Sequence, residues 1–309
     1  MALHVTSTRE PFPTPSLLGQ ATRTHRTAAA QGGGGQLQLF EVSSRKLPIS
    51  KSGAIDDMCE RVGVPIPEMI FGDNLVSVRH PASGWALEFA AEAALDRVEK
   101  TDRGMLRVAH AGEWSSSREL GAASAAGIRQ VVKPFDWSYS SDYRGSETAG
   151  GSGGDGGEEQ QKKRLGGGSS SGSSEPLKPI PLELLKRRDP ILFFDEVVLY
   201  ESELDDNGIS LYSVKVRVME HRMLLLARLY MRLDGVLVRV RDTRVYVDFD
   251  TGDVIREYTA KEDKFENVKR NLMMKGMLPD AITTALRDSN QVAELLPVVE
   301  HDLENLNLA

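Results

Sequence analysis

The chain has 309 residues, of which 40% are hydrophobic, and a formal net charge of −7. This acidic balance argues against general nucleic-acid binding, which needs a basic stripe or domain. No apolar run reaches the ~18 residues of a membrane span. Cys59 is the one cysteine, so no internal disulfide can form and a reducing compartment is expected.

Low-complexity segments divide the chain. Residues 1–35, which end in four glycines, predict a disordered tail. Their Ser, Thr and Arg content also fits an organelle transit peptide, and that alternative stays open. Residues 36–300 predict a single domain, interrupted by a flexible Gly/Ser-rich insertion at about 146–175. Residues 301–309 are expected to form a C-terminal tail.

The first half of the predicted domain alternates strands with short helices. Residues 54–62 have helical spacing and are followed by Gly63 and Pro65, which end a helix. Residues 75–80 and 85–90 predict two strands, separated by a Pro-Ala-Ser-Gly turn. A helical turn or two is expected after residue 92.

The second half predicts an antiparallel meander. A short helix over residues 182–189 precedes strands at about 191–200, 209–219, 224–233, 236–249 and 254–259, with turn residues between them. Helices follow, beginning at Pro279-Asp280. The expected fold class is therefore α+β, with antiparallel sheets flanked by helices.

Asp234-Gly235 lies between two apolar runs and predicts a two-residue type I′ hairpin. This hairpin would pair Leu233 with Val236 and Arg228 with Arg241. Because side chains alternate between faces, one face would be apolar. The other face would hold Arg228, Tyr230, Arg232, Leu237, Arg239 and Arg241.

Such a basic face suggests a docking surface for an anionic partner. The alternative is a solvated face whose arginines are neutralised by acidic neighbours, since like charges opposite one another destabilise a sheet. The apolar alternation also changes phase after Val240. A β-bulge near Asp242 would explain the change, and a simple edge irregularity is the alternative.

Catalytic and metal-binding motifs are missing. The six histidines are scattered singly, and no phosphate-binding loop, nucleophile elbow or kinase signature occurs. No cofactor is expected, and an interaction protein is favoured. One alternative is an RNA-binding protein that stacks bases on Tyr230 between arginines. Another is a hydrolase that uses Asp136 or Asp142, which would require carboxylates clustered in one pocket.

Several long motifs are shared with a known family. They include PEMIFGDN at residues 67–74, KPFDWSYSSDYRG at 133–145, LFFDEVVLYESELDDNGIS at 192–210 and RLDGVLVRVRDTR at 232–244. In this order and spacing, the chain resembles the TIPRL family, the TOR signalling pathway regulator-like proteins, from about residue 36 to 259.

The resemblance implies a protein that is not an enzyme. Family members bind the catalytic subunits of type 2A and related Ser/Thr protein phosphatases, and they modulate phosphatase activity. The family fold is α+β, with a cleft that receives the phosphatase's C-terminal tail. The resemblance also implies a link to TOR signalling through an alpha-4-type regulator, and action in the cytosol and nucleus.

Site residues carry over unevenly. Ile180 aligns with an isoleucine expected at the phosphatase contact. Eight residues of the hairpin fall on the family's arginine-rich pattern: Arg228, Arg232, Asp234, Gly235, Arg239, Asp242, Thr243 and Arg244. Asp242 is expected to pair with a basic group of the partner, and an internal salt bridge to Arg241 or Arg244 is the alternative. The expected partner-binding set is Ile180, Arg228, Tyr230, Arg232, Arg239, Arg241, Asp242 and Arg244.

Overall fold

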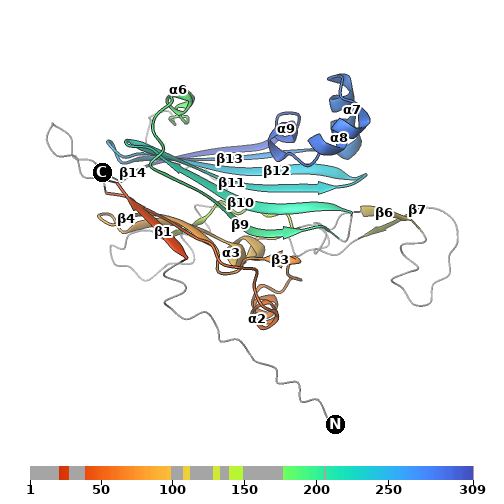
Figure 1. Ribbon diagram of the computed structural model, residues 1–309, viewed down its shortest axis with the longest axis horizontal. Helices are drawn as coiled ribbons and strands as arrows, with labels where there is room; N and C mark the ends of the chain where they lie inside the picture. The colour runs from red at the N-terminus through yellow and green to blue at the C-terminus, as the bar shows by residue number, and fades with distance from the viewer. Residues whose placement is uncertain are drawn as a thin grey trace, which may run out of the picture.

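The computed structural model describes residues 21–27, 39–98, 107–111, 128–132, 139–148, 177–204 and 207–308. Two antiparallel sheets, one above the other, carry the fold (Figure 1). They share one core, to which both sheets contribute fully buried side chains such as Phe89, Leu225 and Val245. The predicted α+β fold class is confirmed.

The larger sheet has seven strands in the spatial order β14-β13-β12-β11-β10-β9-β3. Its strands are β3 Met69–Ile70, β9 Phe193–Ser202, β10 Gly208–Val218, β11 Arg222–Leu233, β12 Leu237–Asp248, β13 Asp253–Lys264 and β14 Val298–Asn307. The smaller sheet, in the order β1-β2-β4-β5-β8, has β1 Thr22–Arg26, β2 Glu41–Arg45, β4 Leu75–His80, β5 Trp85–Ala90 and β8 Ser146–Thr148. β6 Arg107–Ala111 and β7 Ile128–Val132 form a separate hairpin.

Helices flank the sheets. The described helices are α2 Ser52–Val62, α3 Ala91–Asp96, α6 Leu182–Lys186, α7 Phe265–Met274, α8 Pro279–Ala285 and α9 Ser289–Ala293. We call the face of the seven-stranded sheet that packs on the smaller sheet its inner face, and the opposite face its outer face. Figure 1 shows α6 above one end of the outer face and α7, α8 and α9 above the other end.

The predicted meander is confirmed, because β9 to β13 follow one another as antiparallel neighbours. β4 and β5 have the bounds that the sequence predicts. α2 ends where expected, at Gly63, whose left-handed φ of 70° closes the helix without a Cβ penalty.

The hairpin between β11 and β12 lies where predicted, but its strands pair in a different register from the predicted one. Leu233 pairs with Leu237, so the loop has three residues. A type I′ turn needs two positive φ values, whereas only Gly235 in this loop has one, at 72°. A one-residue shift moves every side chain of one strand to the other face. Arg239 and Arg241 therefore lie on the inner face, opposite Met231 and Leu229, and the expected single basic face is wrong.

The predicted bulge near Asp242 is also wrong. β12 pairs in unbroken register with β11 and with β13 along its whole length. The apolar side chains of β12 change face along the strand because a different part of the protein packs on each end of it. Val238 and Val240 pack under the C-terminal helices on the outer face, whereas Val245 and Val247 pack into the core on the inner face.

Two expected tails contain strands. Thr22–Arg26, within the tail expected at 1–35, pairs with β2 as β1. β14 spans the boundary placed at residue 300 and pairs with β13 as an edge strand. Glu300, Asp302 and Glu304 alternate along β14, and this polar sequence is also typical of an unstructured tail. The insertion expected at 146–175 begins with β8, and its residues from 149 onward lie outside the described part.

Candidate functional site

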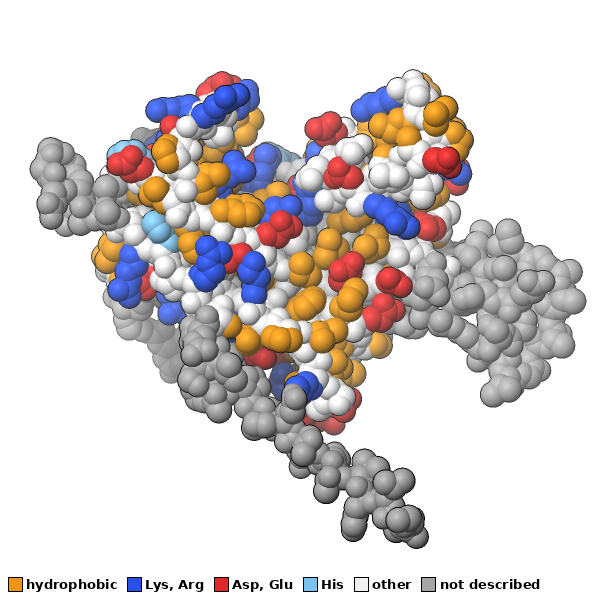
Figure 2. All heavy atoms as spheres, viewed as in Figure 1, with side chains coloured by type: hydrophobic (Ala, Val, Ile, Leu, Met, Phe, Trp, Pro, Cys, Tyr) orange, Lys and Arg blue, Asp and Glu red, His pale blue; other side chains and the backbone are white. Residues whose placement is uncertain are grey.

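The outer face forms a groove between two raised walls. Figure 2 shows the surface hollowed between the projection formed by α6 and the one formed by the C-terminal helices. The floor comes from the middle of β11 to β14. We define the groove by its polar floor residues, which are Arg228, Asp242, Arg244, Glu257 and His301.

The first wall is the segment that carries α6. Ile180 is buried and packs against Tyr246 and Ile255 of the sheet. The backbone of Lys178 exchanges two hydrogen bonds with the Asn305 side chain, N to Oδ1 at 2.5 Å and O to Nδ2 at 3.0 Å. These contacts fix the segment across the edge of β14. At its other end, Asp189 forms an ion pair with Arg222.

The helix on this wall has no buried residue of its own. Several large apolar side chains of the wall instead face solvent. They are Leu177, Leu182, Ile191, Leu192 and Phe194, each about half exposed. An apolar surface of this kind, above a polar floor, is typical of a protein-binding surface.

The second wall is held down by polar groups of the sheet. The hydroxyl of Tyr230 donates a 2.6 Å hydrogen bond to the carbonyl of Leu286, at the end of α8, and Arg232 Nη1 donates to the same oxygen at 3.1 Å. Lys261 Nζ donates to the carbonyl of Ala293, the last residue of α9, at 3.0 Å. Cations at helix C-termini satisfy orphan carbonyls and complement the helix dipole.

Burial raises the pKa of Tyr230 to about 12, so its hydroxyl stays protonated as a donor. Only 2% of Tyr230 is exposed, because α8 and α9 cover it. The RNA-binding alternative thereby loses the aromatic ring on which it depended. Tyr230 positions a helix and offers no surface for stacking.

Asp242 and Arg228 form a bidentate ion pair on the floor. Two parallel hydrogen bonds join Arg228 Nε and Nη2 to the carboxylate, each at 2.7 Å. The two side chains are only 15% and 13% exposed. Asp242 therefore has an internal partner, as the alternative reading expected, but this partner is Arg228 and not Arg241 or Arg244.

Arg244 lies further along the groove and is more accessible, with 37% of its side chain exposed. Its Nη2 contacts Glu257 at 2.7 Å, and His301 Nε2 lies 2.9 Å from the other oxygen of the same carboxylate. The groove thus holds alternating positive and negative groups. A partner surface with both charge signs would match it better than a purely anionic one.

The two remaining arginines of the expected set point away from the groove. Arg239 and Arg241, on the inner face, share Glu262, at 2.5 Å and 3.3 Å. Burial and the neighbouring Arg239 lower the pKa of Arg241. The expectation that arginines would be neutralised by acidic neighbours is confirmed for every arginine of the expected set.

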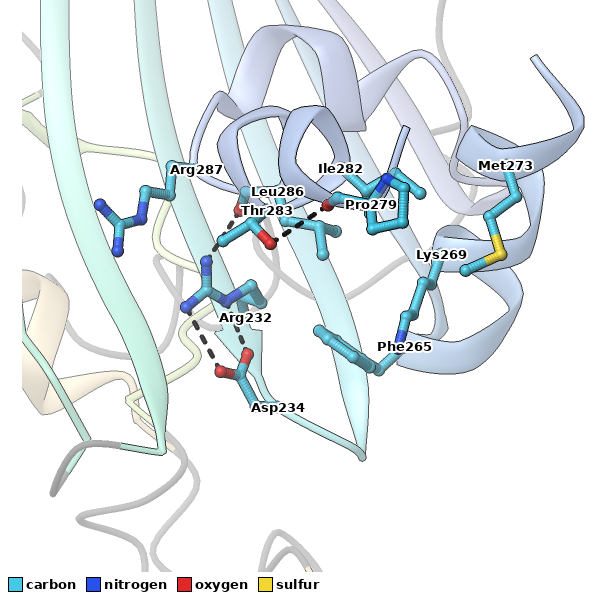
Figure 3. Close-up of a pocket in the computed structure, with 10 residues that line it drawn as sticks. All are labelled: Arg232, Asp234, Phe265, Lys269, Met273, Pro279, Ile282, Thr283, Leu286 and Arg287. Atoms are coloured by element: carbon cyan, nitrogen blue, oxygen red, sulfur yellow. Dashed lines mark hydrogen bonds and ion pairs between the residues drawn. The ribbon is translucent and has the colours of Figure 1, made fainter. Parts of the chain in front are cut away.

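A cavity of about 380 Å³ lies between the hairpin tip and the C-terminal helices (Figure 3). Phe265, Ile282 and Leu286 give it an apolar lining, and Arg232 is fixed at its edge by Asp234 at 2.7 Å. Lys269 and Arg287 also line it, and neither has a carboxylate partner among the described residues. Sequence reasoning missed both cations, because a surface lysine on the amphipathic helix α7 and an arginine in the link between α8 and α9 carry no distinctive signal.

A second cavity, of about 460 Å³, lies beside α2 and α3 and contains three carboxylates, Glu88, Glu92 and Asp96. Glu88 is paired with Arg79, and a hydrogen bond from Arg61 holds the pKa of Glu92 below its ordinary value. Asp142 lines neither cavity, and Asp136 lies outside the described residues. The clustered carboxylates are thus not those on which the hydrolase alternative rests. In the described part of the chain, no group of side chains is arranged to hold a metal ion.

The helices in the described ranges include none long and apolar enough to cross a bilayer.

Comparison with known proteins gives a consistent answer. The model of the TIP41-like family matches residues 69–269, which contain most of both sheets and the groove floor up to β13. A TIP41-like protein of Rattus norvegicus is 36% identical over 274 residues, covering 86% of this chain and 87% of its own length. The type 2A phosphatase activator TIP41 of Saccharomyces cerevisiae is 36% identical over 278 residues, covering 86% and 72%. The type 2A phosphatase activator tip41 of Schizosaccharomyces pombe is 29% identical over 273 residues, covering 87% and 96%. The chain therefore belongs to the TIP41-like family, as the shared motifs indicated.

Proposed function

We propose that this chain is a non-enzymatic regulator that binds the catalytic subunit of type 2A Ser/Thr protein phosphatases and modulates its activity. Two relatives that cover most of the chain are named as type 2A phosphatase activators. The observation that carries the proposal is the outer-face groove, whose charged floor lies between two walls, the first with half-exposed apolar side chains. Such a surface suits a protein partner better than a small substrate.

We place the phosphatase body over the groove and the first wall. Leu182, Leu192 and Phe194 offer exposed apolar anchors, and Arg244 offers an accessible cation on the groove floor. Binding there would bury the apolar groups and keep the charges paired across the interface. Ile180 supports this wall from beneath.

We place the phosphatase's C-terminal tail in the cavity under the C-terminal helices. A chain terminus ends in a carboxylate, which Lys269 and Arg287 can neutralise, and the apolar lining can hold a large side chain beside it. Both cations are available because neither pairs with a carboxylate in the described structure. The link to TOR signalling, the alpha-4-type regulator and the cytosolic and nuclear location stay predictions from the family resemblance.

The test is the affinity of the purified chain for a purified type 2A catalytic subunit, with its tail and with the tail deleted. The double variant K269E/R287E is expected to bind the intact subunit at least about tenfold more weakly and to bind the tail-deleted subunit like the unmodified chain. Lys275→Glu is the matched control, because Lys275 is exposed on the same helical unit and does not line the cavity.

Two results would reject parts of the proposal. Equal affinity for the intact and tail-deleted subunits would show that the tail does not bind in the cavity. No binding of either subunit by the unmodified chain would reject the phosphatase partner altogether.

A further inference from the structure

The Arg228 guanidinium connects the groove floor to the C-terminal helices. Its Nε and Nη2 atoms are held by Asp242, and its Nη1 atom reaches the other way, to Asn290 Oδ1 at 2.8 Å and Ser289 Oγ at 3.4 Å. Ser289 and Asn290 begin α9. One side chain thus touches β12 and α9 at the same time.

From this geometry we infer that Asp242 is a positioning residue, which acts through Arg228 to hold α8 and α9 over the sheet. Arginine has a long flexible side chain, and a bidentate carboxylate fixes the direction of its fork. With Asp242 neutralised, the half-paired guanidinium would move toward water and release Asn290. α9 has only five residues, too few to persist without tertiary contacts.

The consequence extends to the cavity. The peptide that joins α8 to α9 contains Leu286, whose carbonyl accepts from Tyr230 and Arg232, and Leu286 and Arg287 line the cavity. Loosening α9 would therefore displace one wall of the cavity. The inference rests on the proposed function only where peptide binding is concerned, because the movement of the helices can be measured without any partner.

The experiment is a double-mutant cycle with D242N, R228Q and the double variant. The first readout is amide hydrogen exchange of residues 279–296 in the partner-free chain. The second is affinity for a synthetic peptide of the type 2A catalytic subunit's C-terminal tail. E262Q is the matched control, because Glu262 is a partly buried carboxylate that contacts two arginines on the opposite face of the same sheet. Protection of β11 amides checks that each variant is folded.

Each single variant is expected to speed amide exchange in α8 and α9 and to weaken peptide binding by about tenfold. The double variant should bind the peptide no more weakly than the single variant with the lower affinity. E262Q should change neither readout. Additive losses in the double variant, or a binding loss in D242N without faster exchange, would overturn the inference and make Asp242 a direct contact. Loosened helices with unchanged peptide affinity would uphold the positioning role and reject the cavity as the tail site.

Discussion

The hydroxyl of Tyr230, on β11, hydrogen-bonds to the carbonyl of Leu286, 56 residues later in the chain. This contact joins the meander to the C-terminal helices, and it explains why a residue on a supposed binding face is buried. Arg228, Arg232 and Lys261 hold the same helical unit through other contacts. Part of the polar outer face therefore builds the second wall of the groove.

Tyr230→Phe should lower the free energy of unfolding by about 1–2 kcal/mol, because it removes a buried hydrogen bond and keeps the ring. Arg232 still donates to Leu286, which limits the loss. Urea denaturation measures the change. Tyr246→Phe is the control, since the Tyr246 hydroxyl makes only a 3.4 Å contact with Asp248. Equal losses of unfolding free energy in the two variants would show that the hydrogen bond of Tyr230 does not contribute more to stability than that of Tyr246.

Alkaline pH should destabilise the fold steeply. Burial raises the pKa of Tyr230, Tyr246 and Tyr258 to about 12, from an ordinary value of 10.0. Between these values the unfolded chain loses protons that the folded chain keeps, so stability falls as pH rises. Each tyrosine contributes a slope of about 1.4 kcal/mol per pH unit in this window.

The check is urea unfolding at about pH 9, 10 and 11, together with phenolate absorbance. Tyr230→Phe should reduce the slope by the contribution of one tyrosine. An unfolding free energy that stays constant up to about pH 11 would contradict the burial argument.

Ile180→Thr should weaken phosphatase binding without unfolding the protein. Ile180 is buried against Tyr246 and Ile255, and the segment that it anchors lies at the edge of the sheet. A buried hydroxyl there should free the segment locally and leave the core intact. Hydrogen exchange over residues 182–186 should rise, with a change in global stability of no more than ~1 kcal/mol.

Ile180→Val is the control for this position, because it keeps an apolar, β-branched side chain. It should retain most of the affinity. If the threonine variant keeps full affinity while its segment exchanges faster, the first wall takes no part in binding.

Asp195→Asn should release the N-terminal strand. Asp195 is a buried residue of β9. It accepts hydrogen bonds from Arg23 at 3.1 Å and Ser44 at 2.5 Å and pairs with Lys46. Burial pushes its pKa up, but the hydrogen bonds from Lys46 and Ser44 outweigh burial, and the net pKa is below its ordinary value of 3.8. The stabilisation is therefore present above pH 3.8 and is lost as the pH falls further.

Exchange of β1 amides at neutral pH measures the effect of Asp195→Asn, and the unmodified chain should approach that exchange pattern in acid. Glu196→Gln is the control, since Glu196 pairs with Lys215 at an exposed site. Protected β1 amides in the Asp195 variant would show that backbone pairing with β2 suffices.

Local patterns predicted the elements of this fold but not its register. Alternation and turn residues located β4, β5 and the whole meander, because the apolar pattern of a strand depends only on the residues of that strand. The position of Asp234-Gly235 located the hairpin, yet two-residue and three-residue loops both use this dipeptide. The choice between them decides on which face Arg239 and Arg241 lie, and it depends on what each face packs against.

The candidate site was predictable only in part. The family motifs led to Arg228, Asp242 and Arg244, which the structure brings together on the groove floor. Lys269 lies on α7, which carries only an amphipathic pattern, and Arg287 lies in the short link between α8 and α9. Both line the same cavity as Arg232 only because the C-terminal helices dock on the sheet. Burial of Tyr230 could not be predicted either, because the helices that cover it, α8 and α9, lie far away in sequence.

Two arginines on opposite faces of β12 distinguish binding in the groove from binding on the inner face. Arg244 lies in the groove and Arg239 on the inner face, and each is paired with a glutamate of β13. The measurement is the affinity of Arg244→Gln and Arg239→Gln for a purified type 2A catalytic subunit. A loss of about tenfold or more for Arg244→Gln alone is the result that the groove predicts. Unchanged affinity for Arg244→Gln with a loss for Arg239→Gln would contradict it and place the phosphatase on the other face.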